Sequence, residues 1–156
     1  MAEQNTQTTV SETQLIQMAR QEDSILTKKR EMLERLSGFL AELITAKDTL
    51  KEIRTNKGKV FIGIGATIMV EAQVTDTENC KRGFSENGFK DEKISETIEW
   101  LENKENSLKK QIEALSKEYS ESEGRMVQIN GILKQIQGEK RKMVENSKRA
   151  PPTISK

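Results

Sequence analysis

The chain has 156 residues, enough for one domain, and is 33% charged, 33% hydrophobic and only 4% aromatic. This composition is too polar for a compact core of this length and suits long helices that bury one narrow stripe. The 26 basic and 25 acidic residues nearly cancel, so the net charge of +1 gives no argument for a nucleic acid or a membrane surface. With no histidine and only one cysteine, Cys80, the chain lacks the commonest general base and any paired-cysteine metal site. We therefore expect a non-enzymatic protein without metal or cofactor.

The first residues are polar and rich in Gln, Thr and Asn, so residues 1–10 are predicted to be flexible. They lack the apolar stretch of a secretion signal, and no apolar run approaches the ~20 residues needed to cross a bilayer. We therefore expect a cytoplasmic protein. Ser11 is followed three residues later by Gln14, a spacing that predicts a capping box and a helix start near residue 11.

An apolar stripe with an average spacing of 3.5 residues runs through the first predicted helix, residues 11–54. Ten of its twelve positions are apolar, and the exceptions are Glu22 and Lys29. A seam of this length is typical of a coiled coil, and Asn56 and Gly58 predict where the helix ends. The twelve positions are Leu15, Met18, Glu22, Ile25, Lys29, Met32, Leu36, Phe39, Leu43, Ala46, Leu50 and Ile53.

The middle of the chain changes from helical to strand character. Residues 60–64 and 68–74 are rich in β-branched and apolar residues and flank a Gly65-Ala66-Thr67 turn, which predicts a β-hairpin. Asn87-Gly88 predicts a second hairpin, because both residues tolerate positive φ. Gly63-Ile64-Gly65 lacks the remaining signature of a phosphate loop, so we interpret it as strand and turn.

A second apolar stripe runs through the second predicted helix, residues 92–146, with twelve of fifteen positions apolar. Its polar positions, Glu105, Ser122 and Lys140, are predicted to fix the pairing of the helices rather than to carry chemistry. Pro151-Pro152 predicts a disordered tail. The positions are Ile94, Ile98, Leu101, Glu105, Leu108, Ile112, Leu115, Tyr119, Ser122, Met126, Ile129, Leu133, Ile136, Lys140 and Met143.

Neither helix contains a proline, so the simplest fold brings the two stripes together within one chain. The predicted class is mostly α with a small β part, a long antiparallel coiled-coil hairpin with two β-hairpins at its closed end. The predicted parts are a flexible N-terminus (1–10), the first helix (11–54), two β-hairpins (57–91), the second helix (92–146) and a disordered tail (147–156).

The two helices are unequal in length, and this predicts an uncovered apolar end. If Ile53 pairs near Ile94, the antiparallel register pairs Leu15 near Leu133, and the second helix then extends past the first. Its last apolar residues would lack partners. At the other end, a lone hairpin is marginal in water and has bare edges, so two hairpins predict assembly with other subunits.

Three short motifs in residues 60–101 are specific: the turn Ile64-Gly65-Ala66-Thr67, the strand Met69-Val70-Glu71-Ala72, and residues 96–101 after the second hairpin. With these motifs, residues 60–101 resemble the alpha subunit of archaeal-type prefoldin, in its first turn, its second strand and the segment after its second hairpin. Room for two hairpins favours an alpha subunit, since beta subunits carry one. Residues 79–89 are more polar than the second hairpin of the family.

The resemblance implies an ATP-independent chaperone in which two alpha and four beta subunits join through a β-barrel platform. The arms would hold unfolded clients and pass them to a group II chaperonin, with no nucleic-acid or membrane partner. A structural coiled-coil adaptor with one fixed partner is the alternative. The predicted client-binding residues are Val10, Leu15, Ile16, Met18, Ile136, Met143 and Val144. The predicted subunit-assembly residues are Val60, Ile62, Ile64, Ile68 and Val70.

Overall fold

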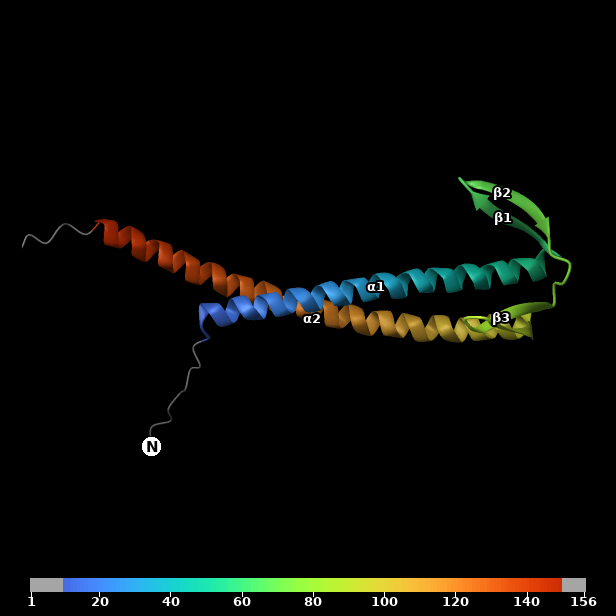
Figure 1. The fold of residues 1–156 in the computed structure, drawn as a ribbon, viewed down its shortest axis with the longest axis horizontal. Helices are drawn as coiled ribbons and strands as arrows, with labels where there is room; N and C mark the ends of the chain where they lie inside the picture. Colours follow the sequence, from blue (N-terminus) through green and yellow to red (C-terminus); the bar gives the residue numbers. More distant parts are fainter. Residues whose placement is uncertain (1–9, 150–156) are drawn as a thin grey trace, which may run out of the picture. The chain divides into compact units, whose positions relative to one another are not determined.

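The structure, a computed structural model, describes residues 10–149. The predicted class is confirmed, because two long helices enclose two antiparallel β-hairpins in the sequence. The second helix extends to Arg149, the last described residue, so residues 147–149, predicted as tail, are helical. The expectations for residues 1–9 and 150–156 lie outside the described residues. The elements, shown in Figure 1, are α1 (Glu12–Thr55), β1 (Lys59–Gly65), β2 (Ile68–Gln73), β3 (Asn79–Ser85), β4 (Gly88–Lys93) and α2 (Ile94–Arg149).

The described residues fall into two compact units. Residues 10–31 and 116–149 form the terminal unit, and residues 32–115 form the hairpin unit. Each helix therefore contributes one stretch to each unit. Along the described part of the chain, neither helix contains a stretch long and apolar enough to cross a membrane.

In the hairpin unit, α1 and α2 pack as antiparallel neighbours around a buried leucine cluster of Leu43, Leu101 and Leu108. Ion pairs follow the same seam, with Lys47 bound to Glu105 and Lys51 bound to Glu102. The pairing is antiparallel because the later α1 residue, Lys51, meets the earlier α2 residue, Glu102.

The seam of α1 in this unit contains Leu36, Leu43, Leu50 and Ile53 as predicted, but it differs from the predicted stripe by one residue at Phe39 and Ala46. Leu40 and Lys47 are half-buried, whereas Phe39 is 49% exposed and Ala46 is exposed. Leu40 and Phe39 are both apolar, so the pattern alone could not choose between them. Lys47 takes the next seam position because its ammonium binds Glu105, which a stripe of apolar residues does not reveal.

A left-handed turn ends α1 and directs the chain into the first strand. Lys57 and Gly58 have φ values of 50° and 84°, and the Gly58 N–H donates to the Ile53 carbonyl at 2.8 Å. A Cβ on Gly58 would lie 2.1 Å from the Val74 carbonyl oxygen, so only glycine fits there. The turn completes a buried cluster of Ile53, Val60, Ile94 and Ile98.

The first hairpin pairs β1 with β2, with Ile62 opposite Val70. Its two turn residues, Ala66 and Thr67, have φ values of 47° and 63°, the conformation of a type I′ turn. This turn suits the twist of the strands but is unfavourable for a β-branched residue such as Thr67.

The second hairpin pairs β3 with β4, with Arg82 opposite Lys90. The second turn lies at the position that Asn87-Gly88 predicted. The predicted left-handed conformation was wrong, because neither residue has positive φ. A Cβ on Gly88 would lie 2.7 Å from the Phe84 ring, so this exposed side chain would have to move to accept another residue there.

In the terminal unit, α1 begins with the predicted capping box. The Ser11 N–H donates to Gln14 Oε1 at 2.8 Å, and the Gln14 N–H donates to Ser11 Oγ at 3.3 Å. These two bonds satisfy amides that the first helical turn leaves free. The helices of this unit are again antiparallel, because Glu12 binds Lys140 and Glu22 binds Arg125.

Candidate functional site

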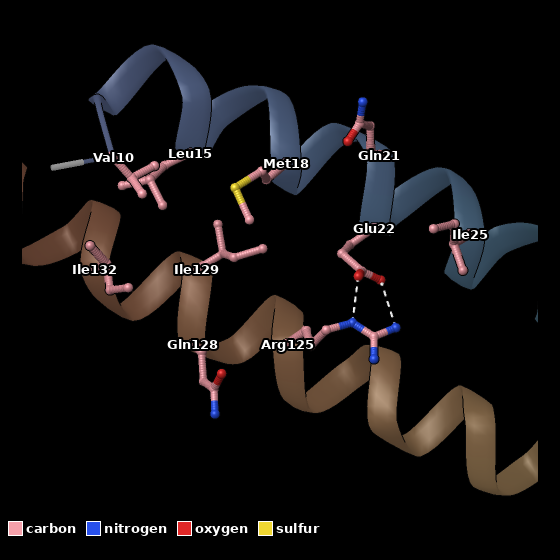
Figure 2. A pocket seen from close by; sticks show the side chains of 10 residues that line it. All are labelled: Val10, Leu15, Met18, Gln21, Glu22, Ile25, Arg125, Gln128, Ile129 and Ile132. Carbon is pink, nitrogen blue, oxygen red and sulfur yellow. Dashed lines mark hydrogen bonds and ion pairs between the residues drawn. The ribbon is translucent and has the colours of Figure 1, made fainter. Parts of the chain in front are cut away.

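A groove of about 370 Å³ lies between the start of α1 and the facing part of α2 in the terminal unit (Figure 2). Leu15 and Ile129 are buried at 5% and 7% exposure and form its base. Met18 points from α1 toward Ile129, whereas the side chains of Gln21 and Gln128 point to opposite sides of the helix pair (Figure 2). The lining residues are Val10, Leu15, Met18, Gln21, Glu22, Ile25, Arg125, Gln128, Ile129 and Ile132.

A polar layer lies beside the apolar residues of the groove. Arg125 Nε donates to Glu22 Oε1 at 2.6 Å, and its Nη2 donates to the Oγ of fully buried Ser122 at 2.8 Å. Lys29 Nζ donates to the same Ser122 oxygen at 3.3 Å and pairs with Glu118 at 3.3 Å. The hydrogen bond from Arg125 lowers the pKa of Glu22, so the carboxylate stays charged. The charges beside the groove are therefore paired with each other.

Only some of the predicted client-binding residues on α1 line the groove. Val10 and Met18 are 47% and 44% exposed and line the groove. Ile16 is 40% exposed but does not line it. Leu15 was expected at the surface and is instead buried, because it packs between the helices. It supports the groove from beneath.

The predicted residues on α2 lie outside the groove. Lys140 binds Glu12 at the start of α1, and α2 continues beyond this pair to Arg149. Met143 and Val144 follow it and are 71% and 55% exposed, whereas Ile136 is half-buried. The overhang of α2 thus leaves two large apolar side chains in water.

Ile132, which is 46% exposed and lines the groove, was not among the predicted client-binding residues. Ile25 was predicted only as a stripe position and is 39% exposed at the groove. The available signal was the Ile132-Leu133 pair, because adjacent apolar residues widen a helix's apolar face beyond a single stripe.

The first hairpin carries an exposed apolar face. Ile62 pairs with Val70, and Ile68 shares their face by alternation along β2, whereas Ile64 lies at the irregularity between Gly63 and Gly65. The exposures of Ile62, Ile64, Ile68 and Val70 are 49%, 62%, 55% and 41%. Val60 was expected to belong to this surface but is only 5% exposed. It lies at the base of the strand, where it packs in the cluster with the helix ends and anchors the hairpin.

The opposite face of the first hairpin is also apolar in part, and its residues were not among the predicted subunit-assembly residues. Phe61 and Met69 are 62% and 60% exposed and lie on the face that Ile62 and Val70 do not occupy. A two-stranded hairpin with exposed apolar side chains on both faces and with free edges is a surface suited to burial by another chain.

The second hairpin is polar, as its sequence indicates. Lys81 and Asp91 form a cross-strand ion pair at 3.4 Å, and Arg82 pairs with Glu92. Phe84 and Phe89 of this hairpin are each 66% exposed. Within residues 10–149, no three His, Cys, Asp or Glu side chains are grouped to hold a metal ion. The surfaces of both units offer apolar contact and hydrogen bonding.

Comparison with known proteins gives one family and one fold. The prefoldin subunit family model matches residues 23–139. The fold is similar to that of a chain in the cryo-EM structure of filamentous PFD from Methanocaldococcus jannaschii, with a TM-score of 0.56 and 18% identity. That similarity covers 74% of this chain and 97% of the other chain. No curated protein matches this chain.

Proposed function

This chain belongs to the prefoldin family of chaperone subunits, and on that premise we propose that it captures unfolded proteins without ATP and transfers them to a group II chaperonin. We place the capture surface at the groove of the terminal unit and the overhanging end of α2. The family is one of non-enzymatic chaperones, so the proposed activity is binding and release.

The observation that carries the proposal is the exposed apolar surface of the terminal unit. The groove combines an apolar base with half-exposed Met18, Ile25 and Ile132, and Met143 and Val144 continue past the start of α1. Monomeric soluble proteins rarely expose such side chains in groups. Methionine is flexible and polarisable, so it adapts to client surfaces of different shape.

The amides and paired charges beside the groove favour clients of no particular charge. Gln21 and Gln128 can each donate to and accept from a client backbone. Glu22 and Arg125 satisfy each other, so neither requires an opposite charge on the client. One arm would bind weakly, and several arms on one client would raise the overall affinity through effective concentration.

Assembly is proposed to occur through the hairpins. The exposed side chains of Ile62, Ile64, Ile68 and Val70 would join hairpins of other subunits, and Val60 would hold their hairpin to the helix ends. Two hairpins favour the role of an alpha subunit, two of which would combine with four beta subunits. The complex would act in the cytoplasm.

The test is an aggregation assay. A denatured client is diluted into buffer containing this chain and a co-expressed beta-type partner, without ATP, and light scattering is followed. Suppression at a near-stoichiometric amount of complex supports the proposal, provided that the complex does not retain the same client in its native form. No suppression by a well-formed complex would favour a coiled-coil adaptor with one fixed partner.

A further inference from the structure

The second hairpin is attached to α2 by a cluster of charged, polar and aromatic side chains, here called the Arg82 cluster (Arg82, Glu92, Thr97 and Trp100). Arg82 Nε donates to Glu92 Oε2 at 2.5 Å, and its Nη2 donates to Oε1 at 3.2 Å. Thr97 Oγ1, from α2, donates to Glu92 Oε2 at 2.9 Å. The Arg82 guanidinium carbon lies 4.6 Å from the centre of the Trp100 ring, also on α2.

The cluster is shielded from water, since the Arg82 and Glu92 side chains are only 18% and 12% exposed. A bidentate arginine–carboxylate pair stacked on an aromatic ring is among the more directional polar contacts in proteins. Hydrogen bonds from Arg82, Lys90 and Thr97 lower the pKa of Glu92 to about 2, so the carboxylate is ionised at neutral pH.

The first hairpin lacks such an attachment among the described contacts. Its base is held by Val60 and Ala72 in the buried cluster and by the hydrogen bond from Gln73 Nε2 to the Lys57 carbonyl at 2.8 Å. Beyond the base, residues 61–71 are all exposed. The two hairpins are therefore attached in different ways, the first only at its base and the second along one face.

We infer that Arg82 and Glu92 are positioning residues that hold one face of the second hairpin against α2 and leave its opposite face, around Phe89, for a β-hairpin of a neighbouring subunit. The claim that a neighbouring subunit binds the free face rests on the proposed function. The claim that Arg82 and Glu92 attach the hairpin to α2 does not.

Strand alternation determines which residues lie on the free face. Cys80, Arg82 and Glu92 share the face directed at α2, where Cys80 Sγ lies 3.2 Å from Thr97 Oγ1. Phe89 belongs to the other face, 66% exposed, with its ring over Gly83. The exposed Lys81–Asp91 pair lies beside it on the same face. An exposed ring bordered by charges of both signs suits a neighbour with an apolar side chain and mixed charges rather than an apolar barrel interior.

The attachment is tested in the free full-length chain with Arg82→Gln/Glu92→Gln, which removes both charges together. Trp100 is the only tryptophan, so its fluorescence reports on the cluster directly. The matched control is Lys81→Gln/Asp91→Asn, which removes an exposed ion pair of the same hairpin whose side chains are 74% and 80% exposed.

For the Arg82 and Glu92 variant we expect a red-shifted Trp100 emission that is more readily quenched by acrylamide. Amide exchange in residues 79–93 should accelerate by about tenfold, the factor for losing a charge-assisted hydrogen bond. The control should match the wild type in both measurements. Unchanged Trp100 emission in the Arg82 and Glu92 variant would overturn the attachment. Arg82→Lys keeps the positive charge but lacks the planar guanidinium that forms two hydrogen bonds with Glu92, so we expect an intermediate shift of the Trp100 emission.

The free face is tested in the complex with a co-expressed beta-type partner. Phe89→Ser should weaken the complex by about tenfold or more in native mass spectrometry dilution series while leaving Trp100 emission unchanged. If Phe89→Ser leaves the affinity of the complex unaltered, the face around Phe89 does not bind the neighbouring subunit. If the wild-type chain forms no complex with a beta-type partner, both the proposed function and the role of this face are wrong. The Trp100 fluorescence of the free chain still tests whether Arg82 and Glu92 attach the hairpin to α2.

Discussion

Arg125 and Glu22 are 103 positions apart in the sequence, yet Arg125 Nε donates to Glu22 Oε1 at 2.6 Å beside the apolar groove. The Glu22 side chain is only 13% exposed, so its charge depends on this partner. The same guanidinium also binds the buried hydroxyl of Ser122, and both contacts lie within the seam of the terminal unit. The pair therefore couples the register of the helices to the position of the groove.

Removing one partner of this pair should destabilise the terminal unit more than removing both. Arg125→Leu leaves the Glu22 carboxylate without its main hydrogen-bond donor, whereas Arg125→Leu/Glu22→Leu replaces the pair with apolar contact. We expect a lower thermal midpoint for the single variant and recovery in the double variant. Circular dichroism melts of the two variants provide the measurement. Equal midpoints for the single variant and the wild type would show that the pair has no structural role.

Acid should weaken the hairpin unit through two carboxylates. The pKa of Glu105 is lowered to about 2, first by the hydrogen bond from Lys109 and then by that from Lys47, and the pKa of Glu92 is lowered to about 2, first by Arg82. Because the folded pKa lies below the ordinary value of 4.5, each group stabilises the fold above pH 4.5. That contribution is lost as the pH falls from about 4.5 to about 2.

Thermal midpoints measured from neutral pH down to pH 2 should therefore decline across this window. Glu105→Gln should lower the midpoint at neutral pH and make the decline shallower, since the variant has one fewer shifted carboxylate to protonate. Parallel curves for the variant and the wild type would rule out Glu105 as a source of the acid sensitivity.

The overhanging end of α2 should matter for holding clients and not for folding. Ile136→Ser/Met143→Ser/Val144→Ser should reduce suppression of client aggregation and leave the oligomer intact. The two exposed positions should each change stability by less than about 0.5 kcal/mol. Val127→Ser is the matched control, because Val127 is 70% exposed on the same helix and does not line the groove. Unchanged holding by an intact oligomer would refute the assignment of this end.

Two neighbouring residues of the first strand should separate anchoring from assembly. Val60→Ala removes two buried methyl groups and should lower the free energy of unfolding by about 2 kcal/mol. Ile62→Ser changes a side chain that is 49% exposed and should chiefly weaken association with a beta-type partner. Urea unfolding and native mass spectrometry measure the two effects. If Ile62→Ser destabilises the free chain as much as Val60→Ala does, the two residues do not have separate roles in anchoring and assembly.

The first hairpin should gain stability from a turn sequence that suits its conformation. Ala66 and Thr67 both have positive φ, which costs an L-residue roughly 1–2 kcal/mol. Ala66→Asn/Thr67→Gly supplies the residues that type I′ turns prefer and should slow amide exchange in β1 and β2. The matched control, Glu86→Asn/Asn87→Gly, changes a turn without positive φ and should give no such gain. Equal effects in both hairpins would contradict the argument.

Local patterns in the sequence determined the elements and their order. The capping box at Ser11, the stop at Gly58 and the first turn at residues 65–67 are contained in a few adjacent residues, so each could be recognised from the chain alone. Asn87-Gly88 gave the position of the second turn but not its conformation. The seam of α2 was also recognisable, since Ile94, Leu101, Leu108 and Ile129 are all buried as their spacing predicts. Local hydrogen bonds and a helical period carry this information without any partner.

Only the tertiary structure decided which apolar residues are covered. In the structure, Leu40 and Lys47 are half-buried in place of Phe39 and Ala46, and Lys47 has an ionic partner on the facing helix. Val60 is buried because its strand begins beside the helix ends. The tertiary structure also brought Ile132 to the groove and Arg82 onto Trp100, contacts between residues with no shared pattern in the sequence. Burial and pairing depend on what faces a side chain across space, and periodicity along one helix or strand contains no information about that neighbour.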